Sequence, residues 1–327
     1  MAQWLPPWSN IIMHVKWFTH QQLWYPESMS KVITPVFLFW LAFTLAALLI
    51  AAIYNERLEK YRVVRQFHFL LNKLRRFQLM ILRVGLGLGF LLQLYTGTYI
   101  SPSFVSNDKW VYFFLIAAMA GLLHRKLLLG SGLAITVLYI TAIVSYGIFH
   151  ALDYVFYVGI IYYLCVVNTR WSPSVNMVLY FFTGLSLAWI AMEKLTLPEL
   201  AYSLMYEYHL PTLGFSVEHF VLISAFIELG LAWAFIVGLL NRFSAFLLTG
   251  IFILTTTVFG FTEIVGHTIV HTMLILFIIN GNDGFKTLFK FHRTMTMRCL
   301  FVVINFCVLL FGLMTVYIWL GQWSYHT

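Results

Sequence analysis

The sequence predicts an all-α fold, a polytopic helical bundle in a membrane. Of the 327 residues, 61% are hydrophobic and 10% are charged, whereas a soluble domain averages about 25% charged residues. The apolar residues form unbroken runs of about 15 to 24, near the roughly 20 that a membrane helix needs. These runs lack the alternation of outer-membrane barrel strands. Soluble, disordered, collagen-like and disulfide-rich classes are therefore excluded.

The chain begins with an aromatic segment, residues 1–32, which we expect to lie on the outer face of the membrane. It contains Trp4, Trp8, Trp17 and Trp24, and tryptophan is enriched where a membrane meets water. The segment lacks the long apolar stretch of a cleavable signal peptide. We therefore interpret it as an interfacial piece.

Ten transmembrane helices are predicted from the apolar runs. Their ranges are 33–54, 77–100, 110–123, 127–149, 151–168, 176–196, 217–240, 243–263, 264–281 and 299–320. Residues 33–76 hold the first helix and a basic cytoplasmic loop. Residues 285–327 hold a second basic cytoplasmic loop, the last helix and a short tail.

Basic residues orient these helices. The segment 55–76 carries seven Lys and Arg, and alternating topology puts 15 basic residues on its side of the membrane and four on the other. The positive-inside rule makes the first side cytoplasmic, with both termini outside. The net charge of +8 therefore indicates membrane orientation, and no nucleic acid is expected as a partner.

The same topology places most acidic residues and histidines toward the outer side. The histidines there are His150, His209, His219, His267 and His271. Loop acids such as Glu199 and Glu207 are tolerated outside without any role, because the orientation rule says little about Asp and Glu. That simple alternative explains the histidines less well.

The chain resembles itself at an offset of 117 residues. Residues 120–125, Ala-Gly-Leu-Leu-His-Arg, align with residues 237–242, Val-Gly-Leu-Leu-Asn-Arg, and His150 aligns with His267. We expect two four-helix units, 77–168 and 176–284, in the same orientation and related by an axis along the membrane normal. The second unit has the longer outer loop and more polar residues, so we interpret it as the active copy.

A polar stripe is predicted near the start of the ninth helix. Glu263, His267 and His271 are spaced i, i+4 and i+8, which places them on one helix face. Histidines four residues apart are a common metal-ligand pair, so His267 and His271 are candidate ligands of a transition metal or haem. A proton-handling or quinone site and a purely structural stripe stay open as alternatives.

Glu228 is the most informative single residue. It lies about ten residues, or roughly 15 Å, into the otherwise apolar helix 217–240. An ionisable residue at such depth indicates a functional site by default. His271 has a suitable depth to be its partner, and the alternative is a neutral Glu228 that donates to a backbone carbonyl.

Further polar residues are candidates for contacts with a bound ligand. They are Glu193, His150, His209 and His219. His209 and the tyrosines between 202 and 208 are also candidates for a lid over the bundle. The sequence has no Walker A, GxSxG, HExxH or CxxC motif, which argues against nucleotide catalysis and a dithiol pair. The glycines in Gly85-Leu-Gly87-Leu-Gly89 are interpreted as small residues for close helix contact.

The stretch 176–284 resembles the DoxX-like family of four-helix membrane proteins. The residues that carry the resemblance are Phe182-Thr-Gly184, Glu193-Lys194, Phe226-Ile-Glu228-Leu-Gly230, Gly238-Leu-Leu-Asn-Arg242 and Asn280-Gly-Asn-Asp-Gly284. The first unit matches only through Arg83-Val-Gly85 and Gly121-Leu-Leu-His-Arg125 and has no Glu between 60 and 192. The resemblance implies membrane subunits linked to quinone-dependent thiosulfate oxidation, redox stress or the maturation of periplasmic amine dehydrogenases.

Three functions are expected from these residues. The first is a redox-linked protein of a bacterial-type inner membrane with a quinone or other small ligand in the outer half of the second unit. In this hypothesis Glu228, His267 and His271 are central, and Glu263 and His219 relay protons outward. The second is a metal-ion or small-solute transporter, since a duplicated bundle with a midplane carboxylate suits transport. The third is a scaffold that recruits a periplasmic enzyme.

Overall fold

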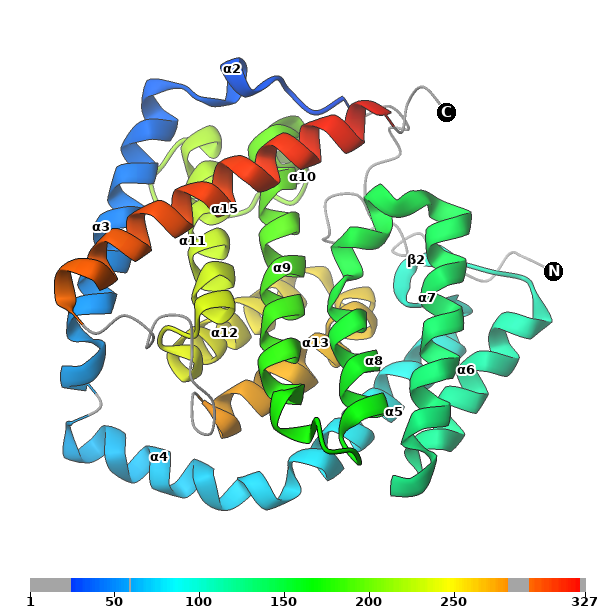
Figure 1. Cartoon of the computed structure of the whole chain (residues 1–327). Coiled ribbons are helices and arrows are strands. Elements are labelled where there is room, and N and C mark those ends of the chain that lie inside the picture. The colour runs from blue at the N-terminus through cyan, green and yellow to red at the C-terminus, as the bar shows by residue number, and fades with distance from the viewer. Residues whose placement is uncertain (1–24, 59, 282–293, 324–327) are drawn as a thin grey trace.

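A computed structural model describes residues 25–58, 60–281 and 294–323 and shows a bundle of helices (Figure 1). Eight of the described helical segments are long and apolar enough to cross a membrane. Two further apolar helices, α6 (Lys109–Leu122) and α8 (Phe156–Val166), are shorter. The predicted helical membrane bundle is confirmed, whereas the length of α6 and α8 leaves eight candidate spans where the sequence predicts ten.

The remaining elements have the following bounds. The helices are α2 (Met29–Val32), α3 (Pro35–Leu58), α4 (Arg62–Leu74), α5 (Gln78–Thr96), α7 (Leu128–Ala151), α9 (Val175–Thr196), α10 (Pro198–Glu207), α11 (Val217–Val237), α12 (Asn241–Phe259), α13 (Phe261–Asn280) and α15 (Met295–Trp323). Two short antiparallel strands, β1 (Thr98–Tyr99) and β2 (Ser101–Val105), form a ribbon after α5. The aromatic residues before 25 and the second basic segment, 282–293, lie outside the described residues.

Eight helices form a closed ring. Each contacts the next in the order α5, α6, α7, α8, α9, α11, α12 and α13, and α13 contacts α5. Helices α3 and α15 pack outside the ring, and α15 crosses obliquely in front of α9 and α11 (Figure 1). Trp233 of α11 donates from its indole nitrogen to the Asn305 side chain of α15 over 2.8 Å, which ties this outer helix to the ring.

Glycines let α5 approach α13 closely. A Cβ atom on Gly85 would lie 2.1 Å from the Thr272 hydroxyl oxygen, and one on Gly89 would lie 2.3 Å from Ile269 Cγ1. Gly87, between them, faces open space. The interpretation of this motif as a close helix contact is confirmed for Gly85 and Gly89, and the contact positions α13, which carries Glu263 and both histidines.

The helix boundaries differ from the predicted ones at three places. Gly260, with φ 71° and ψ −142°, separates α12 from α13, so Glu263 lies in the first turn of α13 and not at the end of the preceding helix. Gly97 ends α5 in the left-handed region, ahead of the unpredicted ribbon. The basic segment 55–76, expected as a loop, contains helix α4, because its apolar residues recur at helical spacing.

The ribbon is fastened to the ring by buried polar groups. The Gln93 side chain accepts from the Ile100 amide over 3.1 Å, and Tyr157 donates to the Ile100 carbonyl oxygen over 3.2 Å. The hydroxyl of Ser101 donates to the Tyr154 hydroxyl oxygen over 2.6 Å. These bonds satisfy backbone groups that would be costly to bury alone and hold Tyr154 at the edge of the site described next.

Candidate functional site

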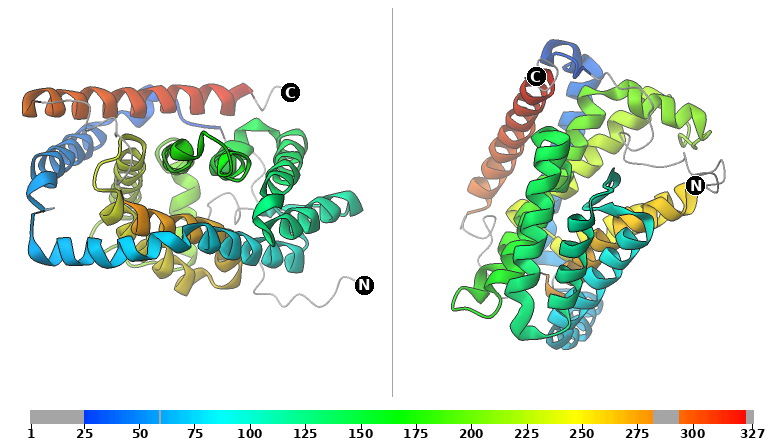
Figure 2. Two further views of the ribbon diagram at one scale, coloured as in Figure 1. Left: turned by 60° about the horizontal axis from the view of Figure 1, so that its bottom comes forward. Right: turned by 90° about the vertical axis from the view of Figure 1, so that its right-hand side faces the viewer.

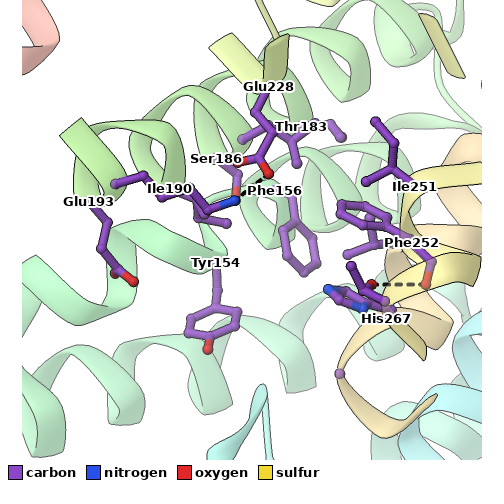
Figure 3. Close-up of a pocket in the computed structure, with 15 residues that line it drawn as sticks. Tyr154, Phe156, Thr183, Ser186, Ile190, Glu193, Glu228, Ile251, Phe252 and His267 are labelled. Atoms are coloured by element: carbon purple, nitrogen blue, oxygen red, sulfur yellow. Dashed lines mark hydrogen bonds and ion pairs between the residues drawn. The ribbon is translucent and has the colours of Figure 1, made fainter. Parts of the chain in front are cut away.

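A cavity lies within the ring, between α9, α11, α12, α13 and the start of α8 (Figure 3). About 850 Å³ of space not filled by atoms lies along its walls, and this figure includes open solvent at the mouth. The lining residues are Tyr154, Phe156, Thr183, Ser186, Leu187, Ile190, Glu193, Lys194, Glu228, Ile251, Phe252, Thr255, Gly266, His267 and Val270. Apolar and aromatic side chains with a few polar groups among them are the usual lining of a small-molecule site.

Helix α9 supplies the largest share of this lining. Thr183, Ser186, Ile190, Glu193 and Lys194 recur at intervals of three or four residues or stand side by side, so they share one helix face. The Ser186 hydroxyl donates to the backbone oxygen of residue 153, and Thr183 donates to the sulfur of Met273 over 3.5 Å. The two hydroxyls therefore bind α9 to neighbouring segments, and Glu193 and Lys194 at the end of α9 provide its charged groups in the cavity.

Lys194 and Glu228 form an ion pair across the cavity wall. The ammonium group of Lys194 donates to Glu228 Oε1, and the two side chains are 19% and 16% exposed, respectively. The partner of Glu228 is therefore Lys194 and not His271, the partner expected from the sequence. A pair so shielded from water contributes a strong local field, and loss of either member would leave the other charge uncompensated.

Glu263 and His267 form a second pair one helical turn apart. The Nδ1 atom of His267 contacts Glu263 Oε2, and the two residues are 5% and 0% exposed, respectively. Glu263 lies in the first turn of α13, where the helix dipole favours a carboxylate. In the tautomer that carries its proton at Nδ1, toward Glu263, the Nε2 atom is the nitrogen that can accept a proton.

An aromatic ring stacks on His267. Phe252 of α12 lies parallel to the imidazole with centroids 4.5 Å apart and an interplanar angle of 9°. The same ring meets His271 edge-on at 6.0 Å. His271 is half-buried and is not among the fifteen lining residues, so the predicted stripe meets the cavity through His267, and Phe252 covers one face of that ring.

The other predicted ligand contacts divide into two groups. Glu193 lines the cavity and is 2% exposed. His209 and His219 are exposed, and neither lines the cavity. His150 is half-buried beside Phe149, with ring centroids 5.4 Å apart, and also lies outside the lining. The geometry thus brings Glu193, Glu228 and His267 to one space and leaves three histidines elsewhere.

The described residues do not supply a metal donor set. Nowhere among them do three His, Cys, Asp or Glu side chains gather closely enough to hold an ion. The rings of His267 and His271 lie 6.4 Å apart at 85°, and a protein metal site normally needs three or four ligands. Among the described residues, these two histidines therefore do not form a metal-ion site with other protein ligands.

Several residues of the cavity are not among the site residues predicted from the sequence. Tyr154, Phe156 and Phe252 belong to patterns common to any membrane helix, so no local signal marks them. Lys194 enters the sequence-based prediction only through a family motif at the end of helix 176–196 and as one of the four basic residues on the outer side. The signal that could have found it is the polar face of α9, on which Thr183 and Ser186 precede the charged residues at helical spacing.

Buried aromatic residues close the ring toward the end where α4 lies. Tyr180 stacks on Phe277 with centroids 3.9 Å apart, and Phe235 lies 5.3 Å from Phe277. The Tyr180 hydroxyl donates to the carbonyl oxygens of Phe277 and Gly281 over 3.2 Å and 3.0 Å. All three rings are buried, so the cavity does not continue between them.

The opposite end is covered in part by α10. This helix packs on α9 and α11, and Tyr208, just after it, meets Phe259 at the end of α12 with ring centroids 5.2 Å apart. Burial raises the pKa of Tyr202 in α10, and the carboxylates of Glu218 and Glu199 raise it further. Tyr202 is therefore a neutral phenol. Through these contacts, α10 and the residues just after it connect α9 to α12.

Comparison with protein-family models, with curated proteins and with solved structures gave no match to this chain.

Proposed function

We propose that this chain is a redox-linked integral membrane protein that binds a quinone, or a similar small ring-shaped ligand, in the cavity within the helix ring. One observation carries the proposal. Two carboxylate pairs, Lys194–Glu228 and Glu263–His267, flank a single aromatic-walled cavity among membrane helices. Ionisable groups so placed are expensive in a bilayer and mark ligand or proton sites.

The wall chemistry suits a quinone. A quinone ring is flat and apolar, and the rings of Phe156 and Phe252 line the cavity. Its two carbonyl oxygens accept hydrogen bonds, which the Lys194 ammonium and a protonated His267 can donate. Reduction to the quinol adds two electrons and two protons, and we assign the electrons to a partner oxidoreductase at the outer face.

The two pairs would exchange the protons. His267 gives or takes a proton at Nε2 while Glu263 stabilises the imidazolium at Nδ1. Glu228, from the Lys194–Glu228 pair, and the nearby Glu193 are two further groups at the cavity wall that can hold a proton. Since the aromatic residues Tyr180, Phe235 and Phe277 close the other end, proton exchange would occur on the α10 side.

Transport of a metal ion or small solute is the second candidate. The shielded Lys194–Glu228 pair favours it, because such pairs occur in transport pathways. A transporter needs access from both faces, and the aromatic closure around Phe277 opposes that. A scaffold for a periplasmic enzyme needs no ion pairs within the membrane, so the site favours it least.

The arrangement of helices supports the rest of the proposal. We assign α5–α8 and α9–α13 of the ring to the two expected DoxX-like units, which would then meet at the α8–α9 and α13–α5 contacts. Helix α6 has 14 residues and would span about 21 Å. We propose that α6 and α8 also cross the membrane, where the bilayer is locally thinner, which gives ten membrane helices. Both termini would lie on the outer side of a bacterial-type inner membrane.

The first experiment is quinone binding to the purified chain. A short-chain benzoquinone or naphthoquinone is titrated against the protein in detergent, and binding is followed by intrinsic tryptophan fluorescence. We expect saturable binding that Glu228→Gln or His267→Ala weakens at least tenfold, while His219→Ala, an exposed histidine away from the cavity, binds as the parent does. Equal binding by all four proteins would overturn the assignment.

A further inference from the structure

Helix α4 has one face packed on the bundle. Val64, His68, Leu71 and Arg75 are half-buried and recur every three or four residues. Arg75 donates to the Asn280 carbonyl oxygen at the end of α13 over 2.5 Å. These contacts fix how α4 is rotated about its axis, so the directions of its two other faces are set.

The second face of α4 is apolar and exposed. Val63, Phe67, Leu70 and Leu74 are 76%, 47%, 59% and 44% exposed, and their spacing places them on one side. Such a row would be unfavourable in water. A helix that lies along a membrane interface buries a row of this kind among the acyl chains.

The third face is basic. Arg62, Arg65 and Lys73 of α4 and Arg76 of the 3-10 turn that follows are exposed. They surround the exposed Phe69, whose ring centre lies 4.6 Å from the Lys73 ammonium. No Asp or Glu occurs between residues 60 and 107. At 3.6 residues per turn, the centre of this face lies about 130° from the centre of the apolar face.

The position of α4 completes the pattern. It lies across the end of the bundle, below α9 and α12 in Figure 1 and along one edge of the ring in Figure 2. Its axis therefore runs along the surface at which the membrane helices end. Membrane orientation requires basic residues on this side, but it does not require them to share one face of an amphipathic helix.

We propose that α4 is a binding surface for anionic phospholipid. Its apolar face enters the acyl region, and its basic face binds headgroup phosphates of the same leaflet. An acidic soluble protein would match the charges only and would leave the exposed Val63, Phe67, Leu70 and Leu74 without a partner. A bilayer matches both faces, because each Lys or Arg near an anionic surface gains from the surface potential.

The test uses the full chain in phosphatidylcholine vesicles. The native cysteines are replaced by serine, a fluorophore is attached at Gln66→Cys beside the basic face, and quenching by nitroxide-labelled phosphatidylglycerol is compared with quenching by nitroxide-labelled phosphatidylcholine. We expect preferential quenching by the anionic lipid, and a loss of this preference at high salt.

Two matched variants decide the result. Arg62→Gln/Arg65→Gln should lower the preference about fivefold for each charge. Lys126→Gln/Arg170→Gln removes two exposed charges at the same end from other segments and should change it little. Equal quenching by both lipids, an unchanged preference in the α4 variant, or an equal fall in the control would overturn the proposal. Binding of soluble polyglutamate without any lipid preference would assign the face to an acidic protein instead.

Discussion

Lys194 of α9 and Glu228 of α11 are joined by an ion pair at the wall of a cavity enclosed by membrane helices. The two residues are separated by a complete helix, α10, and by the loop that follows it. Their pairing explains how a bundle with so few charges tolerates a carboxylate deep in an apolar helix. It also places a fixed dipole beside the space where we propose the ligand binds.

Breaking this pair should destabilise the protein more than removing it. Lys194→Met or Glu228→Leu leaves one shielded charge without its partner and should cost about 3 kcal/mol. The double variant removes both charges and should cost clearly less than the sum of the two single changes. Thermal unfolding in detergent measures all three, and additive losses would show that the two side chains act independently.

The contact between α5 and α13 should be sensitive to a single methyl group. Gly85→Ala would place a Cβ against Thr272, and such overpacking costs about 1–3 kcal/mol. Gly87→Ala is the matched control, because nothing lies within 4 Å of that position. The melting temperatures of the two variants give the comparison, and equal values would contradict the described contact.

Arg242 should be structurally important, and Arg125, which aligns with it in the sequence, should not be. Arg242 is buried and donates to the carbonyl oxygens of Ile278 and Ile279 over 3.0 Å and 2.9 Å, which satisfies the end of α13. Arg242→Gln should cost about 2–3 kcal/mol. Arg125, at the aligned position, is exposed and bonds the Asn168 side chain over 2.8 Å, so Arg125→Gln should cost under about 1 kcal/mol.

The sequence predicts the helices well because long apolar runs leave few alternatives in a membrane. It predicts Glu228 and His267 for a related reason, since polar residues inside such runs are conspicuous. The partner of Glu228 could not be predicted, because Lys194 lies near a helix end where a charge is ordinary. Two residues that lie at the same depth in the membrane need not be in contact, because the sequence does not show which helices are neighbours.

Glycine positions explain the boundary errors. The break before α13 falls at Gly260, whose φ of 71° suits glycine, but the surrounding sequence is apolar on both sides. The predicted helix therefore extends four residues past Phe259 and leaves Glu263 at its end. The ribbon after Gly97 was missed because its strands, of two and five residues, are too short to show an alternating pattern and have no conventional hairpin turn between them.

His267 should affect ligand binding more than His271. His267 lines the cavity and is held by Glu263, whereas His271 contacts only the edge of the site through Phe252. His267→Ala should weaken quinone binding at least tenfold, and His271→Ala no more than about threefold. Parallel titrations of the two variants make the comparison, and a larger effect at His271 would shift the site along α13.

The most direct test of the central claim is the lipid extract of the purified protein. The chain is purified in mild detergent, its quinone content is measured by solvent extraction and absorption, and Glu228→Gln is treated identically. We expect a quinone in near-stoichiometric amount in the parent and a clear loss in the variant. A parent that carries no quinone and binds none when a short-chain quinone is added would contradict the claim.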